Sequence, residues 1–267
     1  MTVRFAKMHG AGNDFVLIDD REGAFPCRRE VLAALGARGT GVGCEGIILV
    51  RKSDRLDFRM KFFNPDGSEA EMCGNGARCV AAFAREIGAA KSDRMRFETL
   101  AGDVGAEIVG PGLVRVEMTQ PRDLRDSFVN SGVPHRIVPV DDLGKTDVEE
   151  EGRRIRYSAE FAPAGTNVDF VAYHAPDRAD IRTYERGVEA ESGACGTGAV
   201  AAALVGVAQY GLRFPVRIHT VKGYELVIGG EFDGKDFRFV TLTGPVARVF
   251  TGEIDLDSLD RNVRDRR

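Results

Sequence analysis

The chain has 267 residues, a formal net charge of −4 and a pI near 5.7. Lysine and arginine are spread along the sequence without a basic stripe, so the composition argues against nucleic acid or a membrane surface and favours work on small molecules. No apolar run of signal-peptide type follows the first residues, and the apolar stretch at 199–208 is too short to cross a bilayer, which predicts a cytoplasmic protein. Five cysteines, an odd number, indicate free thiols rather than a disulfide framework.

At this length the chain can form two ordinary domains, each with a core of its own. In the first part, apolar runs predict strands at 3–8, 15–19, 47–50 and 56–63. A helix is predicted at 26–37, where Pro26 stands near the first position and Gly39 follows the end. The segment 41–46 has the G-x-G-x-x-G spacing of dinucleotide sites, but a helix precedes it and a strand follows it. Because that fingerprint requires the opposite order, the segment does not indicate a nucleotide cofactor.

The segment 73–82 (Cys-Gly-Asn-Gly-Ala-Arg-Cys-Val-Ala-Ala) places a cysteine directly before a predicted helix of small residues. The same plan returns at 195–202 (Cys-Gly-Thr-Gly-Ala-Val-Ala-Ala). Alternating residues around glycines predict further strands at 95–99, 104–109, 113–118, 168–173 and 181–186, and a last meander up to 249. The charged run 149–154 is interpreted as a solvated turn.

Other landmarks repeat with the two cysteines. Asp57-Phe58-Arg59 matches Asp180-Ile181-Arg182, and Thr99-x-x-Gly102 matches Thr220-x-x-Gly223, at an offset that drifts by one residue per landmark. Asp14-Phe15-Val16 also resembles Asp169-Phe170-Val171, but its distance to the cysteine is longer, which predicts that the helix near 26–38 is an insertion in the first half. A long repeat of this kind predicts two similar domains that face each other.

Each of the two cysteines stands where a helix begins. The glycines leave the first helical N–H groups uncovered, so these groups and the helix dipole attract a carboxylate and favour a thiolate. One Cys-Gly alone would more often be a buried structural cysteine, but the duplication favours a function. In facing domains, one thiolate can remove the proton α to a carboxylate while the opposite thiol protonates the other face, which predicts stereoinversion. Zinc-ligand spacing and a cofactor-binding lysine motif are both missing, so no metal and no cofactor are expected.

The chain resembles the diaminopimelate epimerase family of pyridoxal-independent racemases and epimerases. The motifs that carry the resemblance are 7–15, 63–68, 71–79, 165–168, 184–187 and 194–198. It implies an α+β fold of two pseudo-symmetric domains, each a β-barrel-like sheet around a central helix, with the active site in the cleft between them. Residues 1–120, completed by the C-terminal strand at about 247–267, would carry Cys73, and residues 121–246 would carry Cys195. It also implies a cytoplasmic homodimer that interconverts LL- and meso-diaminopimelate for lysine and peptidoglycan precursors.

The resemblance also implies roles for single residues. Cys73 would donate and Cys195 accept the proton in the forward direction, while His135 and Glu185 would adjust the pKa values of the thiols. The implied substrate-binding residues are Asn13, Asn64, Gly74, Asn75, Asn167, Glu185, Arg186, Gly196 and Thr197. Backbone N–H groups of 74–75 and 196–197 would hold the reacting carboxylate, and Arg186 would bind the distal one.

Some interpretations stay open at the level of sequence. Asn13 and Asn64 stand in predicted turns, where an amide often braces the backbone, and a lone histidine is more often structural than catalytic. Two positions depart from the family pattern: Gly46 replaces a glutamine of some members, and Val133 replaces an asparagine. An enzyme acting on a cyclic imino acid, as proline racemase does, would keep both cysteines. It would not need Asn64, Asn167 and Arg186, the residues expected to bind the distal end of diaminopimelate. A non-catalytic amino acid binder would need no cysteine pair, and a redox dithiol protein would need two sulfurs close enough to bridge.

Overall fold

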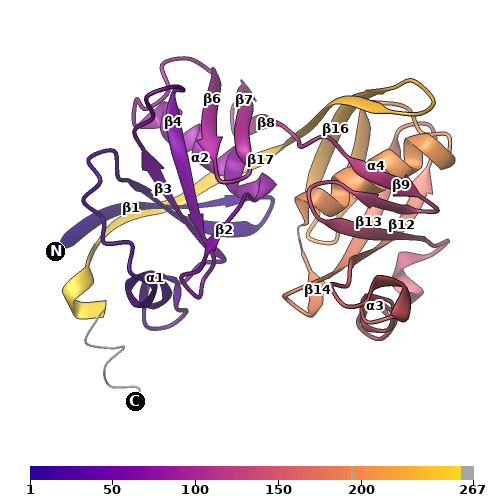
Figure 1. The fold of residues 1–267 in the computed structure, drawn as a ribbon, viewed down its shortest axis with the longest axis horizontal. Helices are drawn as coiled ribbons and strands as arrows, with labels where there is room; N and C mark the ends of the chain where they lie inside the picture. The colour runs from indigo at the N-terminus through magenta and orange to yellow at the C-terminus, as the bar shows by residue number, and fades with distance from the viewer. Residues whose placement is uncertain (194, 260–267) are drawn as a thin grey trace. The chain divides into compact units, whose positions relative to one another are not determined.

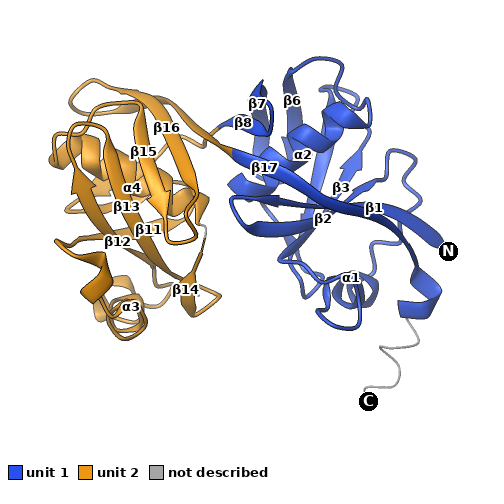
Figure 2. Ribbon diagram, turned by 180° about the vertical axis from the view of Figure 1, so that it is seen from behind, with its two compact units in different colours: residues 1–116, 245–267 blue, residues 117–244 orange. Residues whose placement is uncertain are grey.

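The computed structural model describes residues 1–193 and 195–259. The chain divides into two compact units (Figure 2): the first comprises Met1–Val116 and the segment that begins at Pro245, and the second comprises Glu117–Gly244. Each unit contains both strands and helices, which confirms the α+β prediction. The domain boundaries at 120 and 246 remain a prediction; the two compact units divide at Val116/Glu117 and at Gly244/Pro245. Among the residues described, no helix is both long and apolar enough to span a membrane.

The first unit is a closed barrel around a helix (Figure 1). Its strands pair in the order β1, β2, β3, β4, β6, β7, β8 and β17, and β17 returns to β1. The pairs β2–β3 and β4–β6 are parallel, and a helix occupies each crossover, as a parallel connection requires. The elements are β1 (Thr2–Gly10), β2 (Asn13–Asp19), α1 (Arg29–Gly36), β3 (Gly46–Arg51), β4 (Phe58–Phe63), β5 (Glu69–Ala70), α2 (Gly74–Glu86), β6 (Arg94–Thr99), β7 (Gly102–Gly110), β8 (Leu113–Glu117) and β17 (Phe237–Asp255).

Strands β2 and β3 are continuous apolar runs because both of their faces are buried. On the inner face, Phe15 and Ile48 pack on α2: a Cβ added at Gly76 would lie 3.1 Å from Ile48 Cδ1 and 3.5 Å from Phe15 Cε1. The absence of a side chain at Gly76 therefore lets the helix lie close to the barrel strands.

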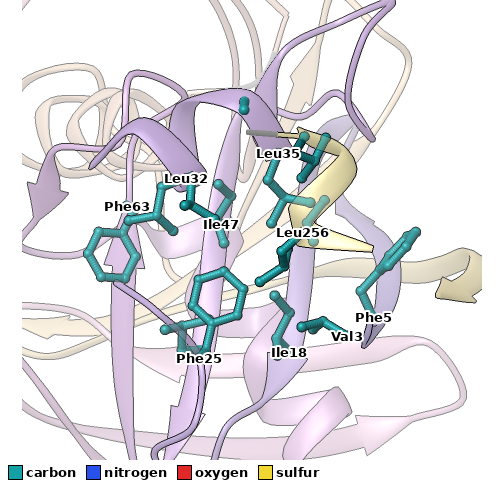
Figure 3. Packing of buried hydrophobic residues seen from close by; sticks show 14 of the residues in the cluster. Val3, Phe5, Ile18, Phe25, Leu32, Leu35, Ile47, Phe63 and Leu256 are labelled. Carbon is teal, nitrogen blue, oxygen red and sulfur yellow. The ribbon is translucent and has the colours of Figure 1, made fainter. Parts of the chain in front are cut away.

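The outer face of the same strands is covered by α1 and by the C-terminal segment (Figure 3). Ile18 and Ile47 belong to one buried cluster with Leu32 and Leu35 of α1. Leu256, which follows β17, lies in that cluster as well. The last described part of the chain thus completes the core of the first unit.

The second unit repeats this order of elements. Strands β11 and β12 pair in parallel across α3, and β13 and β15 pair in parallel across α4. Helix α4 contacts β10, β11, β12, β13, β15 and β16, so it is the central helix of its unit. The elements are β9 (Arg122–Arg125), β10 (Phe128–Asn130), β11 (Pro134–Pro139), η1 (Leu143–Lys145), α3 (Val148–Arg156), η2 (Ala159–Phe161), β12 (Asn167–His174), β13 (Arg178–Glu185), β14 (Ala190–Ser192), α4 (Gly196–Gln209), β15 (Val216–Thr220), β16 (Glu225–Phe232) and the first part of β17.

The structure corrects part of the predicted repeat. The two cysteines, strands β4 and β13, and the hairpins at Thr99 and Thr220 occupy equivalent places, as expected. The match between Asp14 and Asp169 is wrong, because Asp14 lies on β2 whereas Asp169 lies on β12, the counterpart of β3. The helix near 26–38 is therefore no insertion, since α3 takes the place of α1 in the second unit.

The charged run at 149–154 lies within helix α3 and is not the predicted turn. Asp147 caps the helix by accepting a hydrogen bond from the Glu150 backbone N–H at 3.0 Å. Three glutamates occupy the first turn and three arginines the last, an arrangement that suits the helix dipole. Gly152 faces the strands, because a Cβ there would lie 2.4 Å from the Tyr184 Cβ. The segment has few apolar residues and a glycine on its buried face, so its sequence lacks the apolar periodicity that would have predicted a helix.

The burial of Cys79 of α2 in the core of the first unit can be tested by the pH dependence of stability. The side chain is fully buried, and burial raises the pKa of its thiol from 9.0 to about 12. Above about pH 9 the unfolded chain releases this proton while the folded chain keeps it, so the free energy of unfolding falls as pH rises, by up to roughly 1.4 kcal/mol per pH unit. We expect Cys79→Ala to show a shallower alkaline decline than the wild type in urea unfolding at several alkaline pH values. The exposed Cys27, changed to Ala, is the control, and equal slopes for wild type and Cys79→Ala would contradict the assignment.

Candidate active site

Cys73 is the residue from which α2 begins. Its backbone is extended, with φ −133° and ψ 124°, and no side chain caps the helix. The first N–H groups of α2, from Gly74 onward, therefore lack a side-chain acceptor at the N-cap, and the positive end of the helix dipole lies beside the sulfur. Such a terminus is suited to an anionic group such as a carboxylate.

The hairpin between β1 and β2 brings Asn13 to this helix terminus. Its two-residue turn has positive φ at Ala11 and Gly12, 51° and 85°, the pattern of a type I′ hairpin. Asn13 Oδ1 accepts a hydrogen bond from Asn75 Nδ2 at 3.2 Å, and Cys73 Sγ donates to the same oxygen at 3.7 Å. A Cβ at Gly10 would lie 2.8 Å from the Asn75 carbonyl oxygen, so the close approach depends on glycine. Asn13 thus joins the sulfur and the helix terminus.

A buried guanidinium lies under the first turn of α2. Arg78 has no exposed surface, and it donates to the Gly74 carbonyl oxygen at 3.2 Å and to Asn75 Oδ1 at 2.7 Å. Burial lowers its pKa, and the charges of Cys79 and Cys73 act in the opposite direction. Among the described residues, the charges that act on Arg78 are those of the two cysteines and not of a carboxylate, and its Nε has no hydrogen-bond partner. The cation holds Asn75 in place and attracts an anionic sulfur or ligand to this terminus. The sequence interpretation gave Arg78 no role.

Asn64 and Gly46 are the other two positions of the first unit that the sequence singled out for substrate contacts. Asn64 is exposed in the turn after β4, where its Nδ2 donates to Ser68 Oγ at 3.1 Å. Gly46 is buried, and a Cβ there would lie 2.5 Å from the Phe62 ring, so the glycine is required by packing. The preceding residue, Glu45, accepts a hydrogen bond from Asn13 Nδ2. Glu45 was not predicted, and only its position beside Gly46 could have indicated it.

Cys195 begins α4 in the second unit, and a chain of hydrogen bonds leads from its sulfur into the core. Cys195 Sγ lies 3.5 Å from Thr197 Oγ1, which lies 3.0 Å from His135 Nε2. His135 Nδ1 in turn lies 2.7 Å from Asp169 Oδ2, and both of these side chains are fully buried. Two strands and a helix supply the members, since His135 is on β11, Asp169 on β12 and Thr197 in the first turn of α4.

Asp169 was missed as a site residue, although it stands as a lone carboxylate in an apolar strand. Its second oxygen, Oδ1, accepts a hydrogen bond from Thr183 Oγ1 of β13 at 2.7 Å. The helix approaches it closely, because a Cβ at Gly198 would lie 2.4 Å from that oxygen. An acidic residue inside the run 168–173 is the sequence signal, since a buried carboxylate needs donors nearby.

The surroundings of Cys195 differ from the prediction. A helix N-terminus was expected to favour the thiolate, but burial raises the pKa of Cys195 well above its ordinary value, and the negative charges of Glu185 and Asp169 raise it further. A hydrogen bond with Thr197 and one from the Gly198 backbone N–H act in the opposite direction but do not outweigh these effects. Desolvation and two carboxylates dominate over the dipole at this position. Cys195 therefore keeps its proton at neutral pH unless a base receives it.

Asn167 and Arg186 lie close together at the start of β12 and the end of β13. Asn167 is buried; its Nδ2 donates to the Pro134 carbonyl oxygen at 3.1 Å, and its Oδ1 accepts from the Arg186 backbone N–H at 2.8 Å. Arg186 Nη1 donates to the Ala164 carbonyl oxygen at 3.3 Å. Asn167 thus braces the segment that carries Glu185 and Arg186, a role that the sequence did not predict. Val133 lies in the turn before β11, where its carbonyl oxygen accepts from the Ser131 N–H.

Comparisons with known proteins show the family to which the chain belongs. The sequence model of the family "Diaminopimelate epimerase" matches residues 5–124 and 127–249, ranges that include both cysteine motifs. The chain belongs to the diaminopimelate epimerase family. A curated family member from Aquifex aeolicus is 42% identical and aligns over 97% of this chain and 100% of its own length. Another, from Chlorobaculum tepidum, is 42% identical over 93% of this chain and 100% of its own length.

The fold also occurs outside the family. A crystal structure described as a probable proline racemase from Agrobacterium radiobacter K84 has a TM-score of 0.72, is 18% identical and covers 98% of this chain and 95% of its own. At that identity the likeness concerns the fold.

In residues 1–193 and 195–259, no cluster of three or more His, Cys, Asp and Glu side chains could hold a metal ion.

Proposed function

We propose that the protein is a cofactor-independent epimerase that interconverts LL- and meso-diaminopimelate, a reaction that serves lysine and peptidoglycan precursor synthesis. The observation that carries the proposal is the duplicated placement of Cys73 and Cys195 at the start of the central helix of each unit. The names of the family members supply the substrate. The same proposal places the enzyme in the cytoplasm as a homodimer.

In the proposed mechanism the two sulfurs act on one α-carbon from opposite sides. One sulfur, as thiolate, accepts the α-proton; the other, as thiol, donates a proton to the opposite face, and their roles exchange in the reverse reaction. An α-proton is weakly acidic, so the carbanion needs electrostatic stabilisation. Backbone N–H groups of Gly74, Asn75, Gly196 and Thr197 would supply it by holding the reacting carboxylate at the two helix termini.

Incubation with LL-diaminopimelate and separation of the stereoisomers by chiral chromatography tests the proposal. We expect conversion of LL- to meso-diaminopimelate, and the same final mixture when the reaction starts from the meso isomer. The double variant Cys73→Ser with Cys195→Ser is the control for contaminating activity. L-proline is the comparison substrate: racemisation of proline without conversion of diaminopimelate would assign the protein to the other activity.

The distal end of the substrate is proposed to bind Arg186. Replacing Arg186 with lysine removes a planar two-point contact with a carboxylate, and a point charge does not restore its geometry. We expect KM to rise by roughly 30-fold, corresponding to about 2 kcal/mol, with little change in the melting temperature. Steady-state kinetics and thermal unfolding measure the two effects. The exposed Arg213, changed to lysine, is the matched control, and an unchanged KM in Arg186→Lys would remove this residue from the site.

A further inference from the structure

We infer that Thr197 and His135 form a proton relay for Cys195 and that Asp169 is the positioning residue that holds this relay in its working state. The inference deepens the proposed function, on which its catalytic consequence rests. The relay itself is a property of the free protein, so it can be tested without any substrate.

The hydrogen-bond partners assign the direction of each bond. Asp169 is an acceptor when ionised, and it has two donors, Thr183 Oγ1 at 2.7 Å and the His135 ring at 2.7 Å. Its contact with Nδ1 places the imidazole proton on that nitrogen and leaves Nε2 as an acceptor. Nε2 then receives the Thr197 hydroxyl proton across 3.0 Å, and Thr197 Oγ1 has a lone pair for the Cys195 S–H at 3.5 Å.

The relay transfers protons only, and each proton that leaves one group arrives on the next. The Cys195 proton passes to Thr197 Oγ1 while the Thr197 proton passes to His135 Nε2. This leaves a thiolate at Cys195, an unchanged hydroxyl at Thr197 and an imidazolium next to the Asp169 carboxylate. The thiolate can then accept the α-proton of the substrate, which returns Cys195 to the thiol needed for the opposite direction and leaves the relayed proton on His135. Without substrate, the reverse transfer along the relay restores the thiol.

The surroundings explain why a relay is needed at this sulfur. Burial and the charges of Glu185, at the end of β13, and Asp169, on β12, make the free thiolate of Cys195 unfavourable. The negative charge of Asp169 also acts on Tyr173 of β12, whose pKa is raised mainly by burial. These groups and His135 are titratable side chains that act on the relay or on its members. An imidazolium that forms as the thiolate forms offsets the unfavourable charge.

Thr197 offers the most direct test, because valine keeps its shape and its backbone N–H but removes the hydroxyl. The readout is the rate at which iodoacetamide alkylates Cys195 in the absence of substrate, measured by peptide mass spectrometry across the neutral pH range. We expect Thr197→Val to slow alkylation at neutral pH by roughly tenfold or more and to move the pH dependence to higher pH. Thr197→Ser, which restores the hydroxyl, should recover most of the rate.

Asp169 has a matched control in the same unit. Asp180 also pairs with a histidine, His174, at 2.9 Å, but this pair is half-exposed and away from Cys195. We expect Asp169→Asn to slow Cys195 alkylation as Thr197→Val does, because an amide cannot hold the imidazolium, whereas Asp180→Asn leaves the rate unchanged. With diaminopimelate, Asp169→Asn should lower kcat by about 10²-fold with a small change in KM.

The outcomes separate the relay from the proposed function. If the wild type fails to epimerise diaminopimelate but the alkylation differences appear, the relay stands and the proposed function falls. If Thr197→Val and Asp169→Asn remain folded by circular dichroism and alkylate Cys195 with the wild-type pH dependence, the relay is overturned. Slower alkylation in Asp180→Asn would also overturn it, since the effect would then not depend on the residues in contact with Thr197 and Cys195.

Discussion

Changing Cys73 or Cys195 to serine is expected to lower the rate of epimerisation by at least about 10³-fold, the largest effect of any single substitution. Serine keeps the shape of the side chain, but its hydroxyl is a far weaker acid than a thiol and its alkoxide is not available as a base near neutral pH. Chiral chromatography measures the loss. Both cysteines are half-buried at helix N-caps, so the melting temperature should change little.

The two single variants should also separate the two steps. In Cys73→Ser, Cys195 can still exchange the α-proton of LL-diaminopimelate slowly with solvent, although inversion fails for lack of an acid on the opposite face. The exposed Cys27, changed to serine, is the matched control and should retain full activity. Retention of activity in either catalytic variant would exclude that sulfur as an acid or base.

Gly198→Ala is expected to reduce both stability and activity. A Cβ at this position would lie 2.4 Å from Asp169 Oδ1 and 3.3 Å from the Cys195 Cβ, and Thr183 holds that Asp169 oxygen by a hydrogen bond of 2.7 Å. The helix start or the carboxylate must shift, which we expect to cost about 1–3 kcal/mol in the free energy of unfolding and about 10²-fold in kcat. Urea unfolding and steady-state kinetics measure these two quantities.

Gly110 provides the control for the glycine substitution. A Cβ at Gly110 has no neighbour closer than 4.0 Å, and the residue is not among those with positive φ, so Gly110→Ala should change stability by less than about 0.5 kcal/mol. Wild-type stability and kinetics in Gly198→Ala would show that the contact with Asp169 is not tight. That result would contradict the claim that the close approach of α4 to Asp169 requires a glycine.

The sequence predicted the parts of the fold that depend on local pattern. Apolar runs and glycine turns located β2, β3 and the hairpin at Thr99, and the cysteine motifs located both central helices. It failed at α3, where charged residues and a glycine conceal a helix whose buried face is decided by contact with Tyr184. The false match of Asp14 with Asp169 followed from that failure, because the helix before β12 was not recognised.

The candidate site was predictable only where residue type and position coincide. Cysteine before a glycine-rich helix start is such a pattern, and the structure places both sulfurs at helix N-caps. The pairing of His135 with Asp169 joins residues 34 positions apart on different strands, so no local pattern shows it. The pKa of Cys195 likewise depends on burial and on carboxylates brought in by the fold, which outweigh the helix terminus that the sequence displays.

The two-base mechanism is tested most directly by the isotope pattern of the reaction in deuterium oxide. The proton removed from LL-diaminopimelate stays on one sulfur while the other sulfur, already exchanged with solvent, delivers deuterium to the opposite face. We predict that early meso product carries deuterium at the inverted α-carbon and that recovered LL-substrate carries none, as measured by mass spectrometry after separation of the isomers. Deuterium in recovered LL-substrate at a rate comparable with inversion would contradict the account, because it would indicate a single base that exchanges with solvent and acts on both faces.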